Sequence, residues 1–198
     1  MVDVKDGWAE FLDPDVVRTK FITMGLFMIA HELLLSAIKD HPLSFFGDQW
    51  TAEKGWRQSE DYKREVLALD PKGKGDMLRG SLAWLKTNGA IDNADDATVY
   101  ELTAARNMIA HELHKIIGGQ QSLDLVRLFP RLTEIVTKIE RWWIINVEIP
   151  TNPDWDGKEI DEDDITPSSV LLIQLLSQVA LGSDESAWAL YRKFVAQT

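Results

Sequence analysis

Residues 95–119 read DDATVYELTAARNMIAHELHKIIGG, and they carry the clearest helical pattern in the chain. Two aspartates open the stretch, which favours a helix start because acidic side chains stabilise the first turn. Gly118 and Gly119 close it, since glycine readily takes the backbone conformation that ends a helix. The apolar residues between these ends recur at helical spacing: Val99, Leu102, Ile109, Leu113 and Ile116. We therefore predict an amphipathic helix with one face buried against other helices.

Similar start and stop signals predict helices on both sides of this stretch. A capping aspartate followed by proline begins the first helix at Asp13, and the Asp-His-Pro triplet at 40–42 is expected to stop it after Lys39. Pro130 has no N–H to donate, so we expect a kink or a split near Phe129. The other predicted helices cover residues 59–69, 76–87 and 122–147, and two C-terminal helices begin at 166–167 and at 183.

These elements predict an all-α fold, because residues 143–149 alone have the composition of a strand and one strand makes no sheet. We expect a bundle of about seven helices in a single domain, with its core in residues 13–147. An acidic loop at 148–165 and a C-terminal helical pair at 166–198 follow this core. Residues 43–58 have no periodicity, and they predict a long loop whose aromatic side chains pack over the core.

The middle of the first helix, residues 21–30, is apolar on nearly every face. A helix of this kind is either covered on all sides within the core or buried in an oligomer, and the pattern leaves both readings open. We assign four of its side chains to the core: Met24, Leu26, Phe27 and Met28.

The 198 residues are 45% hydrophobic and 27% charged, which supplies a core and excludes a disordered or fibrous chain. The absence of cysteine excludes disulfides, thiolate zinc sites and cysteine nucleophiles, and it favours a reducing compartment. Residues 1–11 lack the order of a signal peptide, and the longest uncharged run, 166–183, is too polar for a membrane span. We therefore expect a soluble cytoplasmic protein without a membrane partner.

The net charge of −11 argues against a general nucleic-acid binder, since phosphate contacts need a positive field. Most of this charge is local, however, because residues 148–164 hold eight acids and one lysine. The other 181 residues carry −4, and residues 51–90 and 99–147 are near neutral or slightly positive, which leaves room for a modest phosphate-facing patch there. We expect the acidic segment to be a mobile, solvated loop that serves solubility; shielding a groove from RNA or docking a basic partner are the alternatives.

Common catalytic and cofactor motifs are absent from the sequence. It contains no H-E-x-x-H zinc helix, no glutamate three residues before a histidine as in di-iron bundles, and no glycine-rich nucleotide loop. His111 and His114 at i, i+3 form only a weak metal-binding pattern. We therefore expect neither a metal nor a cofactor.

One hexapeptide, MIAHEL, occurs twice, at residues 28–33 and 108–113. The second copy alone follows Arg106 and Asn107, which gives the string RNMIAH, whereas Leu26 and Phe27 precede the first copy. We therefore treat the copies as unequal and assign His31 of the first copy to a structural, hydrogen-bonded role.

Residues 76–117 resemble the HEPN domains (higher eukaryotes and prokaryotes nucleotide-binding). The resemblance lies in the spacing Leu82-x-x-Leu85-x-x-x-Gly89-x-Ile91, an acidic turn, and a helix carrying Arg106, Asn107 and His111. It implies an all-α homodimer and a metal-independent endoribonuclease. Arg106 and His111 would then form the catalytic pair, with Asn107 as their polar companion. RNA, and not DNA, would be the substrate. A toxin or defence effector held by an inhibitory protein partner fits this reading.

Two other function classes remain open. A non-catalytic HEPN-like interaction or regulatory protein would keep the motif for dimer packing, and the charge of −11 favours it. A helical enzyme acting on a small molecule is the third possibility.

The helical period separates the motif residues. Leu102, Arg106 and Ile109 fall on one face, which places a permanent charge within the apolar stripe. Asn107, His111 and His114 share the opposite side. Five residues turn a helix so that Arg106 and His111 point about 140° apart, so convergence needs a second protomer or a distorted turn. In the alternative reading, Arg106 does no chemistry and its stem extends to solvent or to a carboxylate such as Glu101 or Glu140.

Overall fold

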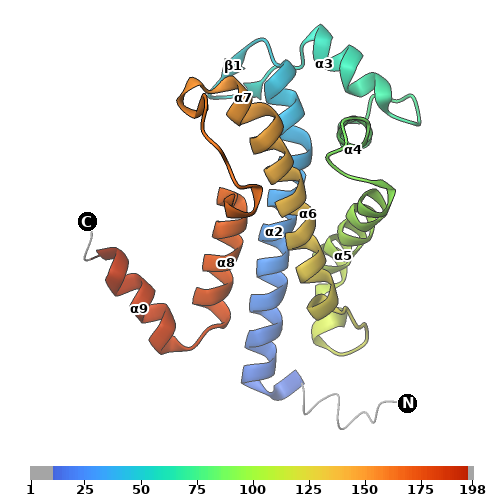
Figure 1. The fold of residues 1–198 in the computed structure, drawn as a ribbon. Helices are drawn as coiled ribbons and strands as arrows, with labels where there is room; N and C mark the ends of the chain where they lie inside the picture. The colour runs from blue at the N-terminus through green and yellow to red at the C-terminus, as the bar shows by residue number, and fades with distance from the viewer. Residues whose placement is uncertain (1–10, 196–198) are drawn as a thin grey trace. The chain divides into compact units, whose positions relative to one another are not determined.

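A computed structural model describes residues 11–195, apart from the side chain of Phe194, and confirms the all-α fold class (Figure 1). In this range the strands are β1 (Trp50–Thr51) and β2 (Gly55–Trp56), which form one antiparallel pair. The expectation that residues 1–11 are not a signal peptide lies outside the described residues, apart from Phe11. The helical elements are α2 (Pro14–Phe46), α3 (Glu60–Glu65), η1 (Leu67–Leu69), α4 (Met77–Thr87), α5 (Asn93–Ile117), α6 (Leu125–Trp143), the π-helix η2 (Ile144–Glu148), α7 (Ile149–Thr151), η3 (Pro153–Trp155), η4 (Glu162–Asp164), α8 (Ser168–Leu181) and α9 (Asp184–Val195).

The chain divides into two compact units. Unit 1 comprises residues 1–31, 101–133 and 168–198, and unit 2 comprises residues 32–100 and 134–167. Three of the four boundaries fall inside α2, α5 and α6, and the fourth lies directly before α8. The C-terminal helical pair thus belongs to unit 1, and the acidic segment belongs to unit 2.

Unit 1 has a core of apolar side chains from the first half of α2, the second half of α5, the start of α6 and one side of α8. The assignment of Met24, Leu26 and Phe27 to the core is confirmed, while Met28 is half-buried. The other buried members are Ala30, Leu102, Ala105, Ile109, Ile116, Ile117, Leu128, Leu132, Val170 and Ile173.

Unit 2 contains a cluster of aromatic rings. Trp143 stacks on His41 with ring centroids 4.6 Å apart, and Trp84 meets Phe46 edge to face at 5.9 Å. The expectation that aromatic residues of 43–58 cover the core is therefore confirmed for Phe46. It is wrong for two others, since Trp50 and Trp56 on the strand pair remain exposed.

The first helix does not stop before Pro42, and the expected end at Lys39 is wrong. α2 continues to Phe46 with Pro42 inside it. Proline removes one helical hydrogen bond, but Pro42 is itself buried, and Phe45 and Phe46 of the following turn pack in the aromatic cluster. The packing of this last turn outweighs the lost bond.

The expected split near Phe129 is also wrong, because α6 runs through Pro130 without interruption. Asp124 caps the helix by accepting a hydrogen bond from the backbone N–H of Arg127 at 3.1 Å. Pro130 lies only one turn further, so the loss is a single bond near the helix start. Residues 143–149, which resemble a strand in composition, form the end of α6, the π-helix η2 and the start of α7.

Local capping signals are confirmed where they were clearest. The Ser59 Oγ accepts a hydrogen bond from the N–H of Tyr62 at 2.9 Å and begins α3. The Asp76 Oδ1 accepts from the N–H of Arg79 at 3.0 Å and begins α4. Gly119 has a φ of +72° just after α5, in the left-handed region that glycine tolerates.

The apolar composition of α2 must be compared with the prediction that the protein is soluble. Among the described residues, α2 is the helix whose length and hydropathy would allow it to cross a membrane. Its most apolar window is 44% buried within the molecule, and one helix of this kind is weak evidence for a membrane span. The structure is compatible with a soluble protein on this point.

A buried carboxylate organises the turn between η1 and α4. Asp70 accepts hydrogen bonds from three backbone N–H groups, those of Lys72, Lys74 and Asp76, each at 3.0 Å. The Arg79 Nε donates to the same carboxylate at 2.7 Å. The guanidinium, helped by the backbone N–H groups and against the effect of burial, holds the pKa of Asp70 well below its usual range.

We predict that Asp70→Asn lowers the thermal midpoint by several degrees, because Arg79 then lies beside a neutral amide. The pKa of Asp70 is lower in the folded than in the unfolded chain, where it is about 3.9. Its stabilising contribution is therefore complete above that pH and is lost as the pH falls below it. Thermal unfolding followed by circular dichroism between pH 2.5 and 7 should show a weaker acid dependence in the variant. Asp61→Asn, which affects an exposed ion pair with Arg64, should change little, and equal effects of both substitutions would contradict the assignment.

Candidate functional site

The structure confirms the predicted rotation of α5 in its second half. Leu102 and Ile109 are buried, and Asn107 and His111 are exposed one turn apart. Arg106 is half-buried at the border between the apolar and the exposed side. All three motif residues belong to unit 1, so their positions on this helix follow from one compact unit.

The structure does not bring Arg106 and His111 together on one helix. α5 is distorted at Glu112, where φ is −122° and ψ is 20°, directly after His111. The backbone between Arg106 and His111 keeps its helical angles, so the two side chains leave the axis about 140° apart. The distortion thus lies after His111 in the chain, so it does not reduce the angle between the Arg106 and His111 side chains.

Arg106 is engaged in an interaction within the structure and is not an isolated charge. The two carboxylates that the sequence suggested as partners also have other contacts. Glu101 pairs with Arg127 at 2.5 Å and with Arg131, and Glu140 lies 3.2 Å from the His41 Nε2. Any catalytic role of Arg106 is therefore additional to the interaction that it already makes.

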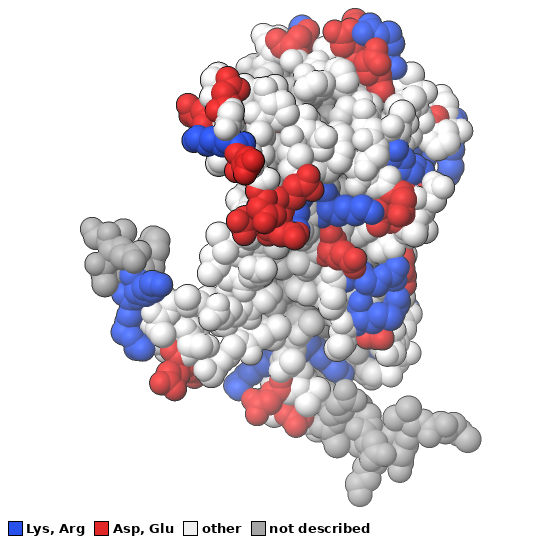
Figure 2. Space-filling view, viewed as in Figure 1, with Lys and Arg blue, Asp and Glu red and all other residues white. Residues whose placement is uncertain are grey.

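Sequence reasoning missed Arg127 and Arg131, two α6 residues that lie against Glu101 of α5. Their N–H groups lower the pKa of Glu101, which keeps this carboxylate ionised. Figure 2 shows the basic side chains over the first turns of α6, bordered by acidic ones. Asp124 approaches Arg127 as well, at 4.0 Å, so this surface is nearly neutral. The i, i+4 spacing of the two arginines was the available signal.

The exposed edge of α5 gathers several ionisable groups around Asn107. The Lys115 Nζ lies 2.5 Å from the Glu112 Oε2, and this lysine is the main cause of a lowered pKa of Glu112. His114 and His111 lower it further through their charge. The edge therefore offers the imidazole of His111 for proton transfer and the amide of Asn107 for hydrogen bonding. Within residues 11–195 no group of three or more metal-ligating side chains is placed to hold an ion.

The first copy of the hexapeptide has a different role. His31 is buried, and its Nε2 lies 3.2 Å from the Thr103 Oγ1 of α5. A buried imidazole with a hydrogen bond inside the core fits the structural role assigned to it. Identical hexapeptides thus stand in two environments, one buried and one at the surface.

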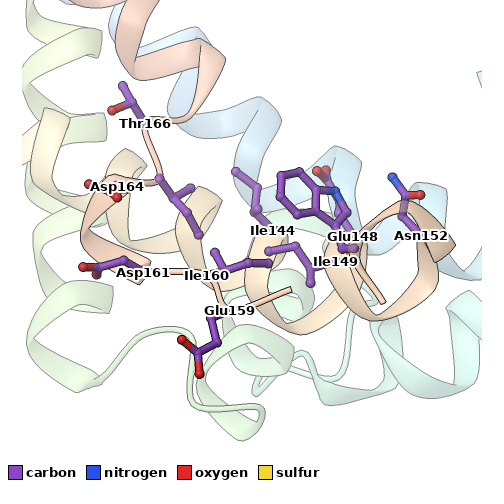
Figure 3. Close-up of a pocket in the computed structure, with 11 residues that line it drawn as sticks. Ile144, Glu148, Ile149, Asn152, Glu159, Ile160, Asp161, Asp164 and Thr166 are labelled. Atoms are coloured by element: carbon purple, nitrogen blue, oxygen red, sulfur yellow. The ribbon is translucent and has the colours of Figure 1, made fainter. Parts of the chain in front are cut away.

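The acidic segment differs from the expected structure-free loop. Residues 148–164 contain α7, η3 and η4, and they line a cavity of about 500 Å³. Figure 3 shows isoleucines grouped in this cavity and carboxylates at its edge. The isoleucines explain the difference. Ile149 and Ile160 give the segment apolar surface to bury, and Ile144 and Ile165 on either side of it line the same cavity.

Comparison of the chain with protein-family models, curated proteins and solved structures found no match. Functional inference therefore depends on the residues of the site itself.

We predict that replacing the five acids between Glu159 and Asp164 by serine leaves the fold intact. The guanidinium of Arg141 holds this segment through backbone oxygens, those of Ile165 at 2.8 Å and Asp163 at 3.2 Å, which serine does not remove. Thermal unfolding should show a midpoint within a few degrees of the wild-type value. Arg141→Ala is the contrasting variant and should lower the midpoint more. A larger drop in the serine variant would show that the carboxylates themselves are structural.

Proposed function

We propose that this chain is a metal-independent endoribonuclease of the HEPN type that acts as a dimer. The observation that carries the proposal is the exposure of Asn107 and His111 one turn apart, with Arg106 at the border of the same helix segment. This arrangement agrees with the Arg-Asn-x-x-x-His spacing of the family that residues 76–117 resemble.

RNA carries its own nucleophile, the 2′-hydroxyl, which explains how cleavage can proceed without a metal. His111 takes the 2′-hydroxyl proton while the 2′-oxygen attacks phosphorus and the bond to the 5′-oxygen breaks. Water supplies a proton to the leaving 5′-oxygen, and protonated His111 returns its proton to the resulting hydroxide, which restores the neutral imidazole. The products are a 2′,3′-cyclic phosphate and a 5′-hydroxyl. Arg106 places its planar guanidinium on the phosphate, where negative charge increases in the transition state.

The angle of about 140° between Arg106 and His111 favours a site shared by two protomers. In such a site Arg106 comes from one chain and His111 from the other, and Asn107 donates its amide N–H to the phosphate or to a base. A regulated RNase of this kind fits a toxin or defence effector held by an inhibitory protein partner.

The second candidate function is a non-catalytic HEPN-like interaction or regulatory protein. Two observations favour it: the net charge of −11 and the engagement of Arg106 in an existing contact. In this reading, the edge of α5 packs against a protein and not against a phosphate.

The test is cleavage of single-stranded RNA in EDTA by purified protein free of partners. We expect cyclic phosphate ends, no cleavage of DNA, and loss of activity of at least about a hundredfold in His111→Ala and in Arg106→Ala. His114→Ala is the matched control on the same exposed edge, and His31→Ala changes the buried copy of the hexapeptide; both should keep normal activity per folded molecule. Failure to cleave any RNA, or activity that needs a divalent ion, would favour the interaction protein.

Mixing the two inactive variants tests the shared site. A heterodimer of Arg106→Ala and His111→Ala protomers contains one site with both wild-type residues, so subunit exchange should restore about a quarter of wild-type activity. A site within each protomer predicts no recovery, which would contradict the composite arrangement.

A further inference from the structure

Helix α8 is an uncharged helix with apolar residues on opposite sides. Val170 and Ile173 are buried on one side. Four large apolar side chains on the other side are between 41% and 53% exposed: Leu171, Leu172, Leu175 and Val179. Their spacing of i, i+1, i+4 and i+8 places them within an arc of about 100°. Figure 2 shows mostly uncharged surface along the lower part of α8.

Helix α2 repeats this spacing in the same unit. Phe21, Ile22 and Ile29 are exposed, and they stand at i, i+1 and i+8, as Leu171, Leu172 and Val179 do. Gly25 takes the place at i+4. A Cβ atom built on Gly25 would meet nothing within 4 Å, so the surface of α2 is open at this position.

Helix α9 adds aromatic surface to unit 1. Trp188 and Tyr191 are 58% and 57% exposed, and their rings meet edge to face at 5.5 Å. Three residues apart, they lie on the same side of the helix. We call the exposed residues of these three helices the apolar face: Phe21, Ile22, Gly25, Ile29, Leu171, Leu172, Leu175, Val179, Trp188 and Tyr191.

We propose that a second copy of this chain covers the apolar face. In this interface α8 of one copy lies against α2 of the other, and Leu175 fills the open position at Gly25. A two-fold axis makes the contact twice, because each copy carries both stripes. The side chains of the apolar face together expose on the order of 800 Å², which is about what one protomer contributes to a stable interface.

Charge selects a second copy over other occupants. Residues 21–30 and 168–181 contain no ionisable side chain, so a basic or acidic partner would find no counter-charge there. Helices that lie on membranes carry lysine and arginine on a solvated face, and neither residues 21–30 nor α8 has one. Only α9 combines exposed aromatic rings with Arg192 and Lys193, so vesicle binding is one of the outcomes tested below. The net charge of −11 also opposes binding to anionic lipid.

The apolar face adds to the proposed function and does not depend on it. The proposed RNase requires two copies to meet at the edge of α5 but does not name the surface that joins them. The apolar face consists of exposed side chains of α2, α8 and α9, which contribute nothing to the motif.

Disulfide trapping tests the register, since the chain has no cysteine of its own. Gly25→Cys and Leu175→Cys are purified separately, mixed under reducing conditions and then oxidised. We expect a disulfide-linked heterodimer on a non-reducing gel, formed much faster than in a mixture of Gly25→Cys with Val126→Cys. Val126 is the matched control, because it lies in unit 1, is 88% exposed and is outside the apolar face. Equal rates in both mixtures would overturn the α8–α2 contact.

Light scattering after size exclusion tests the face as a whole. We expect a wild-type dimer, a monomer for Leu175→Arg and a dimer for Val126→Arg, all with the same helical spectrum. A monomeric wild type, or a Leu175→Arg dimer, would overturn the inference; so would wild-type binding to neutral or anionic vesicles that Leu175→Arg abolishes. If Leu175→Arg is unfolded, the disulfide rates decide.

The two proposals fail in different ways. A wild-type monomer that cleaves RNA overturns the interface and the shared site, but not the nuclease activity itself. The opposite outcome is a disulfide-linked dimer of the Gly25→Cys and Leu175→Cys variants, with no RNA cleavage by this dimer or by the wild type. It overturns the proposed activity but not the interface.

Discussion

Burial of Leu102 and Ile109 fixes the rotation of α5 about its axis. Once these two side chains face the core, the helical period places Asn107 and His111 outside and Arg106 at the border. The same constraint separates Arg106 from His111, which is why the proposed chemistry needs a second protomer. The burial of Leu102 and Ile109 thus explains both why Asn107 and His111 are exposed and why Arg106 and His111 do not meet within one chain.

The two copies of the hexapeptide show that identical short sequences can lie in different structural surroundings, one buried and one exposed to solvent. In α2 the neighbours of the motif are buried, and His31 lies in the core against Thr103. In α5 the helix lies at the surface of unit 1, and His111 faces solvent. Leu26 and Phe27 precede the first copy, whereas Arg106 and Asn107 precede the second. These flanking residues made the difference predictable from the sequence alone.

Features that depend on neighbouring residues were predictable from the sequence. The caps at Ser59 and Asp76 are local hydrogen bonds, and the rotation of α5 follows from its own periodicity. Pro42 and Pro130 misled the prediction of helix ends, because packing and position within the helix decided whether one lost bond mattered. The i, i+4 spacing of Arg127 and Arg131 is visible in the sequence, but their pairing with Glu101 could not be predicted, since it requires the packing of α6 against α5.

The most direct test of the claim that the edge of α5 binds RNA is a histidine NMR titration with RNA that carries 2′-O-methyl groups and cannot be cleaved. The chain has only four histidines, so the imidazole signals can be assigned by single substitutions. We predict that the His111 signals shift as RNA is added and that this shift reaches a plateau. The signals of buried His31 stay unchanged throughout the titration. Unchanged His111 signals at saturating RNA, or shifts confined to His41 of unit 2, would contradict the claim.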